Sequence, residues 1–159
     1  MKKISPLLAS LTLLLMIGCG QSPADNSAGI NPQAAPVVEK EEATSDPMQN
    51  FGIGPIKSVE LAEIDHTLAE EGKTLFNSMC SACHKPTKKY IGPAPINILE
   101  RRSPEWVMNM IMNPTEMVKK DPIAKQLLAD ANGAIMANQN VSEEDARKIL
   151  EYFRTIQEQ

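Results

Sequence analysis

Two cysteines and a histidine stand together near the middle of the 159-residue chain, at Cys80-Ser81-Ala82-Cys83-His84. Two thiols three residues apart, followed directly by an imidazole, form the CxxCH pattern of c-type haem attachment. The spacing has a physical reason, because the thiols reach the two vinyl groups of one porphyrin and the histidine then lies under the iron as an axial ligand. The motif therefore predicts one haem c, bound covalently through Cys80 and Cys83 and ligated by His84.

Other uses of two close cysteines fit this chain less well. A thioredoxin-like CxxC requires a βαβ context, and no segment alternates apolar and polar residues as a strand does. A structural zinc site requires four ligands, and the favoured residue types supply only the motif and the distant His66. A disulfide between Cys80 and Cys83 would close too small a loop to add much stability.

Composition excludes several classes of protein. The formal net charge is −4 and the sequence pI is about 5.2, whereas a nucleic-acid-binding domain needs a basic stripe. Aromatic residues make up only 4% of the chain, so a core of protein side chains alone would be poorly filled. A large apolar cofactor would fill it.

The N-terminus has the features of an export signal. Lys2 and Lys3 precede an apolar stretch over residues 4–17, which is too short to span a membrane comfortably. The stretch ends at Met16-Ile17-Gly18-Cys19, which resembles the lipobox of bacterial lipoproteins. We predict a signal peptide over residues 1–18 and a lipidated Cys19 that anchors the protein in the cell envelope, facing the periplasm. The alternative is an ordinary secretory signal cut near Gly20.

A long linker is expected between this anchor and the folded domain. Residues 20–58 contain five prolines, four glycines and a single aromatic residue, Phe51. Such composition is typical of a flexible chain, whose root-mean-square span would be roughly 35 Å at this length. The sequence therefore predicts an anchor and linker over residues 19–58 and a haem domain over residues 59–159.

Helices are expected to position the motif, and each has a start signal. Thr67-x-x-Glu70 has the pattern of a capping box, and the helix that follows leads into the CxxCH motif. Later helices are predicted to begin at Ser103-Pro104, Asp121-Pro122 and Ser142-x-x-Asp145. The second of these four helices is expected to end at Asn113-Pro114. The domain is therefore predicted to be all-α, with long loops at residues 85–102 and 132–141.

Over residues 66–157 the chain resembles the class I cytochromes c. Four motifs carry the resemblance, in the family's order: Gly72-x-x-x-Phe76 before CxxCH, Gly92-Pro93, Ser103-Pro104-Glu105-Trp106 and Leu150-x-Tyr152-Phe153. The resemblance implies an all-α class I cytochrome c fold, with four to five short helices around one covalently bound haem c. It also implies that Gly72 lets the last helix cross the first closely and that the Pro93 carbonyl orients His84.

The resemblance further implies that Met136 is the sixth ligand of the iron, because the family carries this methionine on a loop just before the last helix. The alternatives are Met117, an open position, or one of Met108, Met110 and Met112, which have the pattern of core residues. His66 would have to reach the far face of the haem, which is hard from the start of the first helix. Trp106 either belongs to the core or donates its indole N–H to a haem propionate.

Basic residues gather around the motif in an otherwise acidic domain: Lys85, Lys88, Lys89, Arg101 and Arg102. They would steer the haem edge toward an acidic redox partner, unless they are simply scattered solvated charges.

The function predicted from these features is a membrane-tethered electron carrier between exported redox proteins, not an enzyme, with no nucleic acid or small-molecule substrate. The run from Arg101 to Trp106, with Met136 to Asn140, resembles small cytochromes of nitrous oxide reductase gene neighbourhoods, so that enzyme or a terminal oxidase is the expected partner. The alternatives are a peroxidase-like enzyme, for which no distal histidine is available, and a gas or redox sensor that displaces Met136. Ala137 makes the sensor conceivable, because the family usually has proline there.

Overall fold

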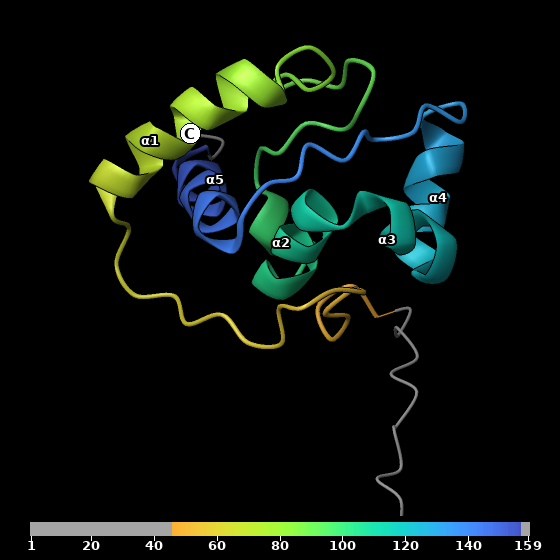
Figure 1. Ribbon diagram of the computed structural model, residues 1–159, viewed down its shortest axis with the longest axis horizontal. Coiled ribbons are helices and arrows are strands. Elements are labelled where there is room, and N and C mark those ends of the chain that lie inside the picture. The colour runs from red at the N-terminus through yellow and green to blue at the C-terminus, as the bar shows by residue number, and fades with distance from the viewer. Residues whose placement is uncertain (1–45, 157–159) are drawn as a thin grey trace, which may run out of the picture. The chain divides into compact units, whose positions relative to one another are not determined.

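The computed structural model describes residues 46–156, which form five α-helices and a short 3₁₀ helix (Figure 1). The elements in chain order are α1 (His66–Met79), η1 (Ile98–Glu100), α2 (Pro104–Met112), α3 (Pro114–Lys120), α4 (Pro122–Asp130) and α5 (Glu143–Thr155). The predicted all-α fold is confirmed. The predicted signal peptide and Cys19 lie outside the described residues, and none of the helices in the described part is long and apolar enough to cross a membrane.

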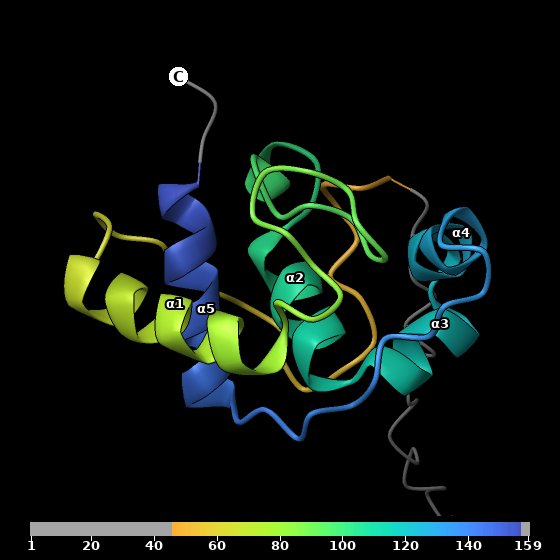
Figure 2. The ribbon, with the colours of Figure 1, turned by 90° about the horizontal axis from the view of Figure 1, so that it is seen from above.

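Helices α1 and α5 cross in close contact, as Figure 2 shows, and Gly72 makes this possible. A Cβ atom at Gly72 would lie only 1.9 Å from the carbonyl oxygen of Lys148 on α5. One turn further along α1, the buried Phe76 ring packs against Tyr152 and Phe153, with ring centroids 5.5 and 5.7 Å apart. The role expected for Gly72 is thus present, and the crossing fixes the end of α1, where the CxxCH motif begins.

Three of the four predicted helix starts are present in the structure. The side chains of Ser103, Asp121 and Ser142 each accept a hydrogen bond from a backbone N–H in the first turn of α2, α4 and α5. The capping box predicted at Thr67 is wrong, because the Asp65 carboxylate accepts from the N–H groups of Thr67 and Leu68. Asp65 therefore begins α1 two residues earlier than expected.

Helix α3 was not predicted. The sequence predicts that one helix ends at Asn113-Pro114 and that the next begins at Asp121, but the chain between them forms seven residues of helix. Pro114 ends α2 because it cannot donate to the preceding turn, yet its fixed φ suits the first position of a new helix. The same proline therefore separates two helices that follow each other directly.

Residues 50–62, here called the strap, run along the outside of α2 and lead into α1 (Figures 1 and 2). Their extended backbone is held by side chains of α2. Asn109 donates to the carbonyl oxygens of Phe51 and Ile56, at 2.8 and 2.9 Å, and accepts from the Ile56 N–H. Glu105 accepts from the Val59 N–H at 2.7 Å. The linker predicted to reach residue 58 is therefore corrected, because residues 50–58 belong to the folded domain.

The strap is also fixed at both ends. At the start, Asn50 is fully buried, donates to Asp121 at 2.6 Å, and accepts at its carbonyl from the Ser103 hydroxyl. At the end, Arg147 and Arg154 of α5 donate to the carbonyls of residues 60 and 62. Both arginines also bind the buried carboxylate of Glu151. The proline and glycine content prevents helix formation here, but polar side chains of the core satisfy the backbone instead.

Candidate haem site

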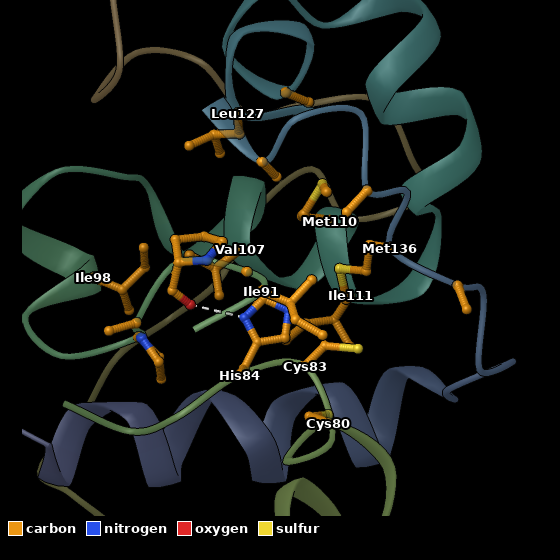
Figure 3. Close-up of a pocket in the computed structure, with 18 of the residues that line it drawn as sticks. Cys80, Cys83, His84, Ile91, Ile98, Val107, Met110, Ile111, Leu127 and Met136 are labelled. Atoms are coloured by element: carbon orange, nitrogen blue, oxygen red, sulfur yellow. Dashed lines mark hydrogen bonds between the residues drawn. The ribbon is translucent and has the colours of Figure 1, made fainter. Parts of the chain in front are cut away.

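An apolar cavity of about 190 Å³ lies between two walls of the domain (Figure 3). One wall comes from the end of α1, the loop that follows it and α5, and the other from α2, α4 and the loop after α4. A single buried water needs only roughly 10–15 Å³, so the cavity can take a much larger group. The apolar lining suits a flat macrocycle rather than a polar substrate.

The cysteine motif sits at the edge of this cavity because α1 ends at Cys80. Two turn hydrogen bonds, from the N–H groups of Cys83 and His84 to the Cys80 carbonyl, fold the motif back on itself at 3.1 and 2.9 Å. Both thiols are free and line the cavity, with Cys80 half-buried and Cys83 exposed. Burial, followed by the neighbouring Cys83, raises the pKa of the Cys80 thiol. The predicted site residues Cys80, Cys83 and His84 therefore come together at one cavity edge.

His84 is oriented by the backbone of the loop that follows it. Its Nδ1 lies 2.7 Å from the Pro93 carbonyl oxygen, and because a carbonyl only accepts, Nδ1 carries the proton. Nε2 is then left with its lone pair, which is the arrangement a metal-ligating histidine needs. The hydrogen bond expected from Pro93 is thus present.

Gly92 brings the same loop against the face of the imidazole. A Cβ atom at Gly92 would lie 2.3 Å from Cε1 of His84, and the Gly92 N–H donates to the Cys83 carbonyl at 2.9 Å. Only glycine allows so close an approach of backbone to ring. The sequence predicts a role for the Pro93 carbonyl alone, and no local pattern indicates the contact between Gly92 and the His84 ring.

Two thioethers line the wall away from the cysteines. Met136, on the loop after α4, and Met110, on α2, both line the cavity, and in Figure 3 both lie on the far side of His84 from Cys80. Met117 is excluded as a ligand, because it is fully buried elsewhere and its sulfur accepts from the Ile53 N–H at 2.9 Å. Among the alternative methionines, Met110 is therefore the one that lines the cavity beside Met136, and the open sixth position stays a prediction that the structure does not test.

His66 and the rest of the α2 methionines do not reach the cavity. His66 is exposed at the first residue of α1, and the 14 residues of that helix place it about 21 Å from the motif. Met108 is buried in the core on the other side of α2, and Met112 is absent from the cavity lining of the described residues. Ligation by a second histidine is therefore not supported.

The structure favours one of the two alternatives for Trp106. Its ring lines the cavity and is almost fully buried, and its indole N–H donates to Asp121 at 3.1 Å. Trp106 is therefore a core residue, and the alternative hydrogen bond to a haem propionate is not supported, because the only donor of the ring is already used within the core. Arg102 lies over the same ring, with its guanidinium carbon 5.3 Å from the ring centroid.

Most of the basic residues near the motif are engaged with the protein. Lys85 donates to the Ser81 carbonyl and lies over the Tyr90 ring. Lys89 donates to the Asp130 carbonyl at the end of α4, and Arg101 to three carbonyls of residues 94–97. Lys88 is exposed and has no hydrogen bond or ion pair within residues 46–156. Of these four residues, Lys88 is therefore the one whose charge has no partner in the described part of the chain.

The helical fold, the two thiols and the oriented imidazole together define a c-type haem protein. The family model described as Cytochrome c matches residues 69–157, and the chain belongs to the cytochrome c family. Among solved structures it is similar to a cytochrome c from Rhodothermus marinus, with 44% identity, a TM-score of 0.62, and coverage of 65% of this chain and 89% of that chain. Comparison with curated proteins finds no match.

Two structures of engineered Rhodothermus marinus cytochrome c, both named Rma TDE, are also similar to the chain. One is 43% identical with a TM-score of 0.62, covering 65% of this chain and 90% of that one. The other, bound to a carbene intermediate, is 44% identical with a TM-score of 0.59, covering 65% and 89%. The protein is therefore a class I mono-haem cytochrome c, with one covalent haem c attached through its cysteines, and a haem electron carrier.

Proposed function

We propose that this cytochrome is a membrane-tethered one-electron carrier between exported redox proteins, with His84 and Met136 as the axial ligands of its haem. The observation that carries the proposal is the placement of His84 and Met136 on opposite walls of one apolar cavity. A histidine and methionine pair gives a six-coordinate haem with a raised reduction potential. Because no ligand has to leave when the oxidation state changes, such a haem suits repeated electron transfer.

The hydrogen bond between His84 and Pro93 supports the same role. It fixes the orientation of the ring, so that the ligand is already in place in both oxidation states. Apolar side chains of α2 and α4 line the opposite side of the cavity. The chain around the site therefore supplies orientation and burial, while bound haem c supplies the one-electron chemistry.

Anchoring through Cys19 is the second part of the proposal. The lipobox-like residues before Cys19 support lipidation, and the folded domain begins only near residue 50. The intervening segment of about 30 residues would allow a span of roughly 30 Å, if it behaves as a coil. The domain could then visit a donor and an acceptor on the periplasmic side of one membrane. The similarity to small cytochromes beside nitrous oxide reductase genes favours that enzyme as acceptor, with a terminal oxidase as the alternative.

A sensor or peroxidase role remains the second candidate, because the Met136 loop is open to solvent. Ile135 is 69% exposed, and the neighbouring residues 137–140 are exposed as well. Such a loop could release its methionine and open the iron to a small ligand. Carbon monoxide separates the two functions, since it binds a reduced haem only where the sixth position is free.

The test uses the full-length holoprotein in membranes. For an electron carrier, the reduced protein should show no spectral change with carbon monoxide, and it should be reoxidised by membranes that contain the acceptor. Cys19→Ser should leave the spectrum unchanged but release the protein from the membrane or block its processing. Ready binding of carbon monoxide by the wild type would refute the carrier with a fixed ligand. Fractionation of the mature wild type as soluble without detergent would refute the anchor.

A further inference from the structure

Two opposite charges flank the Trp106 ring, which is the only aromatic side chain that α2 contributes to the haem cavity. Asp121 accepts the indole N–H at the edge of the ring, at 3.1 Å. Arg102 lies over its face, with the guanidinium carbon 5.3 Å from the centroid. Trp106 itself is only 3% exposed. One indole ring therefore separates a carboxylate and a guanidinium from the cavity that holds the haem.

The carboxylate of Asp121 is enclosed by hydrogen-bond donors. It is completely buried, and each of its described partners is a donor: the Asn50 amide at 2.6 Å, the Trp106 indole and the Ala124 N–H at 2.7 Å. These three donors satisfy both oxygens of the carboxylate. A buried charge acts over a longer distance than an exposed one, because the surrounding dielectric is low and salt screens it poorly.

Arg102 supplies the compensating charge. Its Nε is buried and has no hydrogen-bond partner among the described residues. Burial, followed by repulsion from Arg101, lowers the pKa of Arg102, whereas the attraction of Asp121 opposes this shift. A guanidinium stays charged even when its pKa is lowered, because its ordinary value lies far above neutral pH. The two charges therefore compensate each other across the ring.

We propose that Asp121 and Arg102 are a matched charge pair that sets the reduction potential of the haem. Oxidation removes one electron from the iron to an external acceptor and leaves one more positive charge in the cavity, with no proton transferred and no bond broken. A buried anion favours the oxidised form and lowers the potential, whereas a buried cation favours the reduced form and raises it. Replacing one partner by a neutral residue should therefore shift the reduction potential in the direction set by the charge that is left.

The alternative is that the two residues act only as structural supports. Asp121 also caps α4 and holds Asn50 of the strap, so its loss could loosen the cavity and admit water. Water around a haem favours the more charged oxidised form and lowers the potential, whichever residue was changed. The sign of the shift therefore separates the two explanations.

The experiment measures the reduction potential of the holoprotein by spectroelectrochemical titration. Asp121→Asn keeps an oxygen for Trp106 and Ala124 but removes the charge, and Arg102→Gln removes the opposite charge. We expect Asp121→Asn to raise the potential and Arg102→Gln to lower it, each by at least about threefold in the equilibrium constant, where tenfold corresponds to about 59 mV for one electron. Arg102→Lys should stay near the wild type, because it keeps the charge.

Salt provides the second readout. The shift in Asp121→Asn should persist at an ionic strength of about 1 M, where the Debye length is only about 3 Å, because Asp121 is completely buried, while any shift caused by Lys88→Gln at the surface should vanish. A lowered potential in both neutral variants, or no shift in either, would overturn the proposal. If Asp121→Asn does not fold, Arg102→Gln decides: it must lower the potential while Arg102→Lys does not, and any other result refutes the charge pair.

Discussion

The carbonyl oxygen of Pro93 lies 2.7 Å from Nδ1 of His84, and Gly92, one residue earlier, lies against the face of the same imidazole. One short loop therefore fixes both the tautomer and the tilt of the proximal ligand. Neither contact uses a side-chain functional group of the loop, so both depend on where the backbone runs.

Gly92→Ala should prevent correct placement of His84. The new methyl group would lie within 2.3–2.8 Å of three ring atoms, so either the ring or the loop has to move. We expect a lower yield of holoprotein and an altered ferric spectrum, measured as haem content per protein and by absorbance. Gly133→Asn is the control, because space around Gly133 is open and asparagine tolerates its φ of +80°. Equal spectra for Gly92→Ala and the wild type would disprove the close approach.

Met136→Ala should abolish the weak red charge-transfer band that sulfur ligation gives to ferric haem. The reduced variant should then bind carbon monoxide, because the sixth position is open. Met110→Ala is the matched control, since Met110 lines the same cavity from α2 and should leave the band intact. If the band survives in Met136→Ala and is lost only in the double variant, Met110 is able to replace Met136 as the ligand.

Gly72→Ala should destabilise the whole domain. The obstacle is the backbone carbonyl of Lys148 at 1.9 Å from the new Cβ, and backbone cannot rotate away as a side chain can. We expect a loss of at least about 2 kcal/mol in the free energy of unfolding, which is typical of overpacking at a tight contact. Denaturant unfolding of the holoprotein measures it, with the exposed Lys73→Ala on the same helix as control. Unfolding midpoints that agree between the two variants would contradict the close crossing.

Two deletions of different length should show where the tether ends and the folded domain begins. Deleting residues 20–45 should leave the stability of the domain unchanged. Extending the deletion through residue 58 should cost several kcal/mol, because Asn109 would lose its three backbone partners and Asp121 would lose Asn50. Thermal unfolding of the two shortened holoproteins measures the difference. A domain that is equally stable after both deletions would show that the strap contributes nothing.

The strap also shows what the sequence could not predict. Proline and glycine content predicted a flexible linker through residue 58, because composition cannot tell a free chain from one whose backbone is held by distant side chains. Asn50 binds Asp121 at the start of α4, and Ile56 binds Asn109 on α2. Both partners lie more than 50 residues away in the sequence. Local patterns such as the caps at Ser103 and Ser142 were predicted because their partners are only three residues away.

The haem site also has a part that the sequence predicts and a part that it does not. The CxxCH motif was predictable because haem attachment requires a fixed local spacing. The sequence left the partner of Trp106 open, since its hydrogen bond to Asp121 depends on how α2 and α4 pack. Arg102 was read as a surface charge, although it lies over the indole and is partly buried. The side chains that surround the haem are therefore set by tertiary packing, while those that attach it are set by the motif.

The last prediction concerns steering toward an acidic partner, and the structure changes which residue tests it. Lys85 and Lys89 are held by carbonyls of the protein, whereas Lys88 is exposed without such a partner in the described part of the chain. Charge reversal at Lys89 would also break its bond to Asp130, which joins the loop after the motif to the end of α4. A slower rate in that variant could then come from a disturbed cavity. Lys88 is the cleaner probe.

Lys88→Glu should lower the association rate with the physiological acceptor while leaving the spectrum and the potential unchanged, because rim charges act mainly on encounter. The difference from the wild type should shrink as ionic strength rises toward about 0.15 M, where the Debye length is about 8 Å. Lys125→Glu is the control, since it makes the same change in net charge at an exposed residue of α4. Stopped-flow reoxidation of the reduced protein measures the rates. An equal loss of rate in both variants would mean that net charge alone matters. A rate that changes neither with salt nor with Lys88→Glu would refute steering by this residue.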